Sequence, residues 1–179
     1  MIEHYGDIVE LDYRLGEGVL EGCKQIQDWE WNTEKTRQYI DLIGRIDQGY
    51  RGKDEDDLEP NEFMKRFPEA EQLIKEFEGV YKARIARMQP GSYFEPHRDH
   101  FQGGIRFRIL VPLNNTGRDK YAFFYEDKII EFKERVPYIL NTRKVHGAMC
   151  FAPDTYHLLL SVNNTVDNQR KAVEMMTFR

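Results

Sequence analysis

The chain of 179 residues has little of what marks secreted or membrane-bound proteins. Its only cysteines are Cys23 and Cys150, which form neither a paired metal motif nor a disulfide framework. This scarcity favours a reducing, cytoplasmic setting. The N-terminus does not resemble a signal peptide, and no apolar run approaches the length needed to cross a bilayer. We therefore expect no membrane partner.

The chain also has fewer basic than acidic residues. The chain carries 26 Lys and Arg against 31 Asp and Glu, a net charge of -5. An acidic chain has no general attraction for phosphate backbones, so a nucleic-acid partner is not expected. Aromatic residues make up 13%, charged residues 32%, and the mean hydropathy is -0.71, as is typical of a soluble globular protein. The length fits a single domain over residues 1–179.

The hydrophobic pattern changes near residue 80. Before it, helical spacing dominates, so residues 1–79 are expected to be mostly helical, with a short strand at 7–12 and a charged loop at 48–57. One helix is expected to begin at Asn32, with these apolar positions: Tyr39, Ile40, Ile43 and Ile46. A second is expected from Pro68 to Gly79, with these apolar positions: Ala70, Leu73, Ile74 and Phe77.

From residue 80 onward the apolar residues alternate. Strands are expected at 80–88, 92–99, 105–112, 121–126, 129–133, 136–142, 147–152, 156–163 and 171–178. Many short strands separated by turns, such as the one at Pro90-Gly91, predict a β sandwich or barrel. The predicted fold is mainly β, a jelly roll over residues 80–179 with the N-terminal helices packed outside one sheet.

One strand leaves two orientations open. Between 105 and 111, Ile105, Phe107 and Ile109 share one face, and Arg106 and Arg108 share the other. The apolar face could lie in the core with the arginines in water. Alternatively, the helices cover the apolar face, and the arginines point into the barrel, where they would need anions.

His97 and Asp99 are candidate metal ligands. Two residues apart on a strand, they point the same way, as two members of a facial triad of two histidines and a carboxylate that binds iron(II). So short a pattern can arise by chance and needs a third ligand from a distant strand, either His146 or His157. His100 cannot share the strand face of His97.

Three stretches together resemble the iron(II)- and 2-oxoglutarate-dependent dioxygenases: "RMQPGSYFEPHRDH", "RFRILVPL" and "YILNTRKVHGAM". Within them the chain is most similar to the aspartyl/asparaginyl β-hydroxylase-like branch, which also resembles bacterial free-proline hydroxylases. A Met-x-Pro-Gly turn at residues 88–91 precedes His97. Arg106 follows His97 by nine residues, and His146 follows it by 49. The resemblance implies a cupin-like, double-stranded β-helix catalytic core.

The resemblance also implies roles for residues. His97, Asp99 and His146 would bind iron, Arg108 a carboxylate of 2-oxoglutarate, and Arg106 a substrate carboxylate. Family members usually carry an arginine about ten residues after the distal histidine, where this chain has Tyr156 and His157. The binding of the distal end of 2-oxoglutarate is therefore expected to be shared by three side chains: Arg108, Tyr156 and His157. A later arginine, Arg170, is a further candidate.

The activity that the resemblance implies is hydroxylation of a C–H bond with O₂. The substrate would be an amino acid or a protein or peptide side chain of Asp, Asn or Pro type, and 2-oxoglutarate would become succinate and CO₂. Two alternatives stay open. One is a cupin-like metal-binding protein or metal enzyme that does not use 2-oxoglutarate, and the other is a non-catalytic β-sandwich interaction module.

Overall fold

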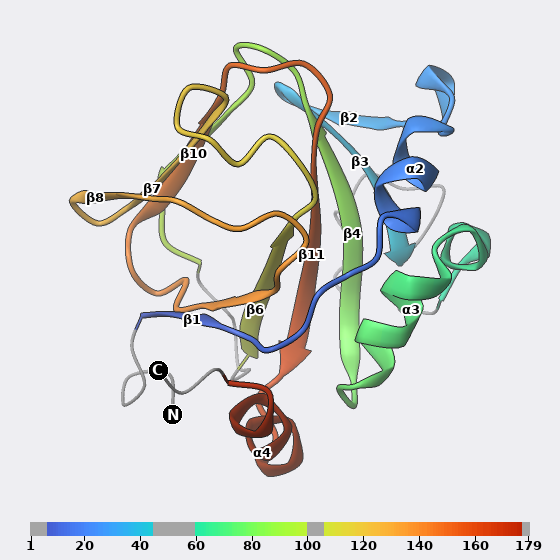
Figure 1. Ribbon diagram of the computed structural model, residues 1–179, viewed down its shortest axis with the longest axis vertical. Coiled ribbons are helices and arrows are strands. Elements are labelled where there is room, and N and C mark those ends of the chain that lie inside the picture. The colour runs from blue at the N-terminus through green and yellow to red at the C-terminus, as the bar shows by residue number, and fades with distance from the viewer. Residues whose placement is uncertain (1–6, 45–59, 100–105, 177–179) are drawn as a thin grey trace.

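The computed structural model describes residues 7–44, 60–99 and 106–176, which form two facing antiparallel sheets with few helices (Figure 1). The large sheet has seven strands in this order: β1 (Ile8–Glu10), β9 (Tyr138–Leu140), β6 (Arg106–Pro112), β11 (Thr155–Asn163), β4 (Val80–Met88), β3 (Arg37–Ile43) and β2 (Asn32–Glu34). The small sheet has four: β5 (Tyr93–His97), β10 (His146–Cys150), β7 (Tyr121–Tyr125) and β8 (Lys128–Ile130).

The helices lie outside the large sheet. Figure 1 shows α2 (Gly18–Lys24) and α3 (Pro68–Lys75) beside β3 and β4, and α4 (Val166–Glu174) at the end of β11. Two 3₁₀ helices, η1 (Asp28–Glu30) and η3 (Glu62–Arg66), complete the described elements. None of these helices is long and apolar enough to cross a membrane. The predicted jelly-roll architecture, mainly β and cupin-like with helices outside one sheet, is confirmed.

The two faces of the large sheet bury separate cores. One core lies between this sheet and the helices and contains Phe107, Ile109 and Val111 of β6. The other lies between the two sheets and contains Leu110 of the same strand. Burying side chains of this size stabilises the fold by roughly 1.5–3 kcal/mol each. Because helices cover the apolar face of β6, Arg108 points between the sheets. Of the two orientations left open by the sequence, the structure therefore shows the one in which this arginine points inward. Ile105 lies outside the described residues.

The prediction of a helix that begins at Asn32 is wrong. Residues 32–34 and 37–43 form the hairpin of β2 and β3, which pairs with β4. Residues 39–43 are all buried, because β3 has the helix-side core on one face and the interior between the sheets on the other. Burial on both faces hides the alternation that normally marks a strand. The N-terminal part is thus less helical than predicted; Ile46 and the expected loop at 48–57 lie outside the described residues.

The expected strand at 171–178 is also wrong over its described part. Residues 166–174 form α4, and the hydroxyl of Thr165 caps the helix by accepting a hydrogen bond from the backbone of Asn168. The capping residue followed by polar residues was the sequence signal for this helix. The other strands expected after residue 80 are present within a few residues of their predicted bounds, and the predicted helix at Pro68 is α3.

Candidate metal centre and cavity

Three predicted ligands meet between the two sheets. His97 ends β5 and His146 begins β10, and the two are register partners with ring centroids 4.3 Å apart. Asp99 follows β5, where its backbone N–H donates to the carbonyl of Thr142 at 2.9 Å. One ligand atom from each of the three side chains lies within 4.8 Å of the others. Within residues 7–44, 60–99 and 106–176 this is the one such cluster of His, Cys, Asp or Glu.

Both histidine rings are oriented by a hydrogen bond between Nδ1 and a backbone carbonyl. The Nδ1 of His97 lies 2.7 Å from the carbonyl oxygen of Glu95, and the Nδ1 of His146 lies 3.0 Å from that of Lys144. A carbonyl can only accept, so each Nδ1 carries the hydrogen and each Nε2 presents a lone pair. Sequence reasoning could not name these partners, because a backbone carbonyl leaves no signature in the sequence.

Gly147 allows the two strands to approach each other. A Cβ at this position would lie 2.9 Å from the carbonyl oxygen of Phe94 and 3.2 Å from the nitrogen of Pro96. The pairing of β5 with β10 is irregular between His146 and Ala148. A side chain at Gly147 would push the strands apart and separate His146 from the ligands on the neighbouring strand.

Asp99 is held as a carboxylate. Arg108 donates from Nε to Asp99 Oδ2 at 3.1 Å, and His97 Nε2 lies 3.5 Å from Oδ1. Burial raises the pKa of Asp99, but the charge and hydrogen bond of Arg108 outweigh it, and the pKa lies below its ordinary value. One oxygen is thus fixed by Arg108, while the other faces the histidines.

His146 is kept neutral by its surroundings. Burial lowers its pKa below the ordinary value, and the hydrogen bond to the Lys144 carbonyl offsets this only in part. A neutral imidazole is the form that binds metal. Two imidazoles that each present an Nε2 lone pair and one ionised carboxylate match the facial triad of non-haem iron(II) proteins, so the residues present fit the predicted metal.

A cavity of about 190 Å³ adjoins the three ligands. Its apolar wall comes from both sheets and includes Phe94, Leu110, Leu140 and Ala148. The polar lining includes His157 and Ser161 of β11 and four cationic side chains: Arg37, Lys82, Arg84 and Arg108.

His157 is buried in the lining of this cavity and is not part of the ligand cluster. Its ring packs against Tyr121, with centroids 4.4 Å apart. Its Nε2 has no hydrogen-bond partner among the described residues. Burial lowers the pKa of His157 to about 3, so the ring is neutral. The structure thus brings His146, rather than His157, to His97 and Asp99.

Other predicted site residues lie elsewhere. Tyr156 faces the helix side of the sheet, where its ring stacks on Trp31 with centroids 6.0 Å apart, and it does not line the cavity. Its neighbour His157 points the opposite way because side chains alternate along β11. Arg106 stacks on Tyr81 at 3.7 Å and also lies outside the cavity lining.

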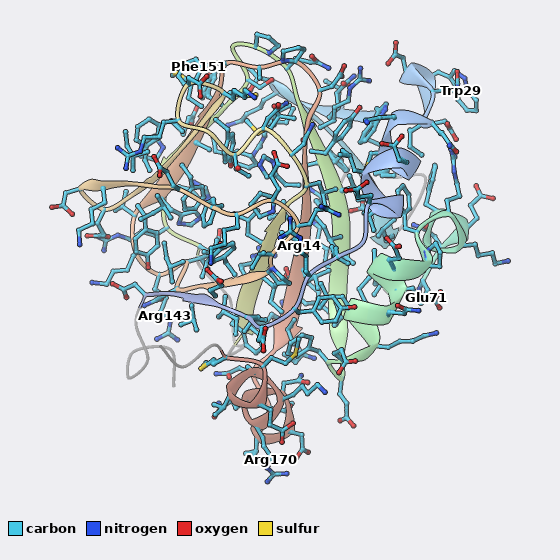
Figure 2. The ribbon with its side chains drawn as sticks, viewed as in Figure 1. Arg14, Trp29, Glu71, Arg143, Phe151 and Arg170 are labelled. Atoms are coloured by element: carbon cyan, nitrogen blue, oxygen red, sulfur yellow. The ribbon has the colours of Figure 1, made fainter. Side chains whose placement is uncertain are left out.

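Arg170, a further candidate, is not brought to the site either. Arg170 lies on the outer side of α4, away from the space between the sheets (Figure 2), and pairs with Asp167 at 3.3 Å. His100 lies outside the described residues. The cationic residues that sequence reasoning missed are on β3 and β4. Arg37 lay in the segment expected to be helical, because burial of β3 on both faces hides the alternation that would have marked a strand.

One comparison with a solved structure supports the fold, and two weaker matches are reported beside it. An oxidoreductase of the 2OG-Fe(II) oxygenase family from Burkholderia pseudomallei matches with a TM-score of 0.53 and 10% identity, covering 87% of this chain and 95% of that one. KdgF from a Halomonas species gives a TM-score of 0.45 at 12% identity, covering 76% and 88%. The Cnp3 cupin domain of Schizosaccharomyces pombe gives 0.44 at 9% identity, covering 78% and 74%.

Comparison of sequences identifies the family. No curated protein sequence matches the chain significantly. The family model described as aspartyl/asparaginyl beta-hydroxylase matches residues 24–164, a range that includes the three candidate ligands and most of both sheets. The chain therefore belongs to the aspartyl/asparaginyl beta-hydroxylase family, a family of dioxygenases that use Fe(II) and 2-oxoglutarate.

Proposed function

We propose that this chain hydroxylates a C–H bond of an amino acid, or of an Asp, Asn or Pro side chain in a peptide or protein, and converts 2-oxoglutarate to succinate and CO₂. The observation that carries the proposal is the arrangement of His97, Asp99 and His146. One ligand atom of each side chain lies within 4.8 Å of the others, and all three residues line a partly apolar cavity. Bound iron and 2-oxoglutarate would supply the oxygen-activating chemistry, and the protein the orientation.

The protein residues have separate tasks in this proposal. His97, Asp99 and His146, which all line the cavity, would hold the iron as its protein ligands. Arg108 orients Asp99 through Nε, and its planar guanidinium offers further donors to a carboxylate of 2-oxoglutarate. His157, neutral and buried, offers a hydrogen bond to the same co-substrate deeper in the cavity.

Two predicted residues receive no role. Tyr156 lies on the far side of the large sheet from the cavity, so it gives no support to a shared clamp on 2-oxoglutarate. Arg106 stacks on Tyr81 and donates to Asn163 outside the cavity lining, so we assign it no contact with the substrate. The apolar wall around the metal ligands serves to exclude water from the reacting groups.

Succinate formation tests the proposal. The Fe(II)-loaded protein is incubated with labelled 2-oxoglutarate and a panel of free amino acids and short peptides, and release of CO₂ and succinate is measured. We expect one member of the panel to raise the release above the level without substrate, and a product of hydroxylated mass to appear. Release that does not depend on added Fe(II) would reject the proposal.

A metal protein that does not use 2-oxoglutarate is the second candidate. The observation that favours it is Tyr156, which stands near the place of the usual arginine and points away from the cavity. This candidate predicts tight metal binding with no metal-dependent binding of 2-oxoglutarate, whereas the dioxygenase requires both.

A further inference from the structure

The outer face of the small sheet is apolar and exposed. The helices lie on the other side of the molecule, outside the large sheet (Figure 1). Among the described residues, seven large hydrophobic side chains are exposed, and five of them belong to β5, β10, β7 and β8 or directly follow β10: Tyr93, Met149, Phe124, Ile129 and Phe151. Each of these five keeps 37–49% of its surface exposed, so this face is open to a partner.

The strand register gathers these side chains into one patch. Met149 is the register partner of Tyr93, and Phe124 is the register partner of Ile129. Phe124 is also paired with Gly147, two residues before Met149 on the same face of β10. Phe124 and Met149 are thus diagonal neighbours about 7–8 Å apart, a distance that long and aromatic side chains span. The patch therefore crosses all four strands of the sheet.

The patch has the size that a stable dimer needs. Taking ~200 Å² for a fully exposed side chain, the five side chains present about 400 Å² of surface. Because roughly 60% of an interface is non-polar, an interface centred on this patch would bury about 700 Å² per partner. Stable complexes bury about 800 Å² per partner, so a protein surface of similar character can cover this face.

Charges at the edges of the face indicate which partner this is. Glu95 of β5 lies 3.8 Å from Lys35 at one edge, and Glu131, which follows β8, pairs with Arg118 at the other. Each edge carries both signs of charge. If a twofold axis runs along the strands, the β5 edge of one copy lies over the β8 edge of the other, and acidic side chains can meet basic ones. A partner of a single charge gains nothing from these paired edges.

We propose that the outer face of the small sheet, centred on Phe124 and Met149, is an interface with a second copy of this chain in a twofold-symmetric dimer. Such an interface is self-complementary and closes after two copies, the commonest form of protein assembly. It lies directly behind the metal centre, because His146 and Met149 point to opposite faces of β10. The dimer therefore braces the pairing of β5 with β10, which carries His97 and His146.

Sedimentation equilibrium of the full chain tests this interface. Interfaces of this size have Kd values in the μM range or below, so at about 100 μM the wild type should sediment as a dimer. Met149→Lys should raise the dissociation constant at least 10-fold, because each copy would bury an unpaired charge. Trp29→Lys is the matched control, since Trp29 is 83% exposed on η1, outside the patch, and this variant should remain a dimer.

A second variant separates loss of the dimer from loss of the fold. Met149→Gln nearly keeps the shape of the side chain and should also weaken the dimer, while circular dichroism shows that the chain stays folded. A wild type that sediments as a monomer at the same concentration overturns the inference, and so does a dimer that persists unchanged in both Met149 variants. A monomeric wild type that binds phosphatidylcholine vesicles would assign the patch to a lipid surface and would equally overturn it.

Discussion

His97 and His146 face each other as register partners on adjacent antiparallel strands, and each donates its Nδ1 hydrogen to the carbonyl oxygen two residues before it. The tautomer of both rings is therefore set by backbone geometry. Metal-ligating histidines are ordinarily oriented through their second nitrogen in this way. The two imidazoles are thus prepared for a metal ion before one binds.

Asp99→Ala should abolish tight binding of Fe(II), because it removes the carboxylate and leaves two imidazoles. Metal titration of the variant and the wild type measures the effect. Asp167→Ala, on the exposed surface of α4, is the matched control and should bind metal like the wild type. Wild-type affinity in the Asp99 variant would exclude this residue as a ligand.

His146→Ala and His157→Ala should have different effects. Loss of His146 should weaken metal binding by more than the 10- to 100-fold that removal of an indirect partner costs. Loss of His157 should leave metal binding intact and raise the concentration of 2-oxoglutarate needed for half-saturation, because this residue lines the cavity and is not part of the ligand cluster. Parallel titrations of metal and of 2-oxoglutarate would show the reverse pattern if His157 were the ligand.

Arg108→Leu should weaken 2-oxoglutarate binding and also change the pH dependence of metal binding. Arg108 lowers the pKa of Asp99, so in its absence the carboxylate becomes protonated at a higher pH. Metal affinity, measured across a pH series, should therefore fall off at a higher pH than in the wild type. Arg106→Leu, on the same strand but outside the cavity lining, should leave both properties unchanged. Similar shifts in both variants would contradict the role of Arg108.

His157 should make the fold less stable in acid. Its pKa is about 3 in the folded protein against 6.5 as its ordinary value, so between these limits the unfolded chain binds the additional proton. Above about pH 6.5 the buried neutral ring does not lower the free energy of unfolding. As the pH falls from there toward 3, the free energy of unfolding decreases by about 1.4 kcal/mol per pH unit. Urea unfolding of His157→Leu should show a correspondingly flatter pH dependence, and parallel curves would show that His157 is not buried in the neutral form.

The sequence could predict the ligands better than the surroundings that orient them. The alternation in β6 revealed two faces, but which face points inward depends on where the helices pack, and only the structure decides that. The hairpin of β2 and β3 was hidden because β3 is buried on both faces, and with it Arg37 was missed. Tyr156 and His157 are adjacent in the sequence, yet strand alternation sends them to opposite sides of the sheet.

The most direct test of the metal centre is equilibrium binding of 2-oxoglutarate without O₂, compared among the Fe(II)-loaded wild type, the metal-free wild type and His146→Ala supplied with the same Fe(II). We predict that one 2-oxoglutarate binds per Fe(II)-loaded wild-type chain, and that the metal-free protein and the variant bind it at least 10-fold more weakly. Equal affinity in all three samples would contradict the assignment of His97, Asp99 and His146 as the centre that receives the co-substrate.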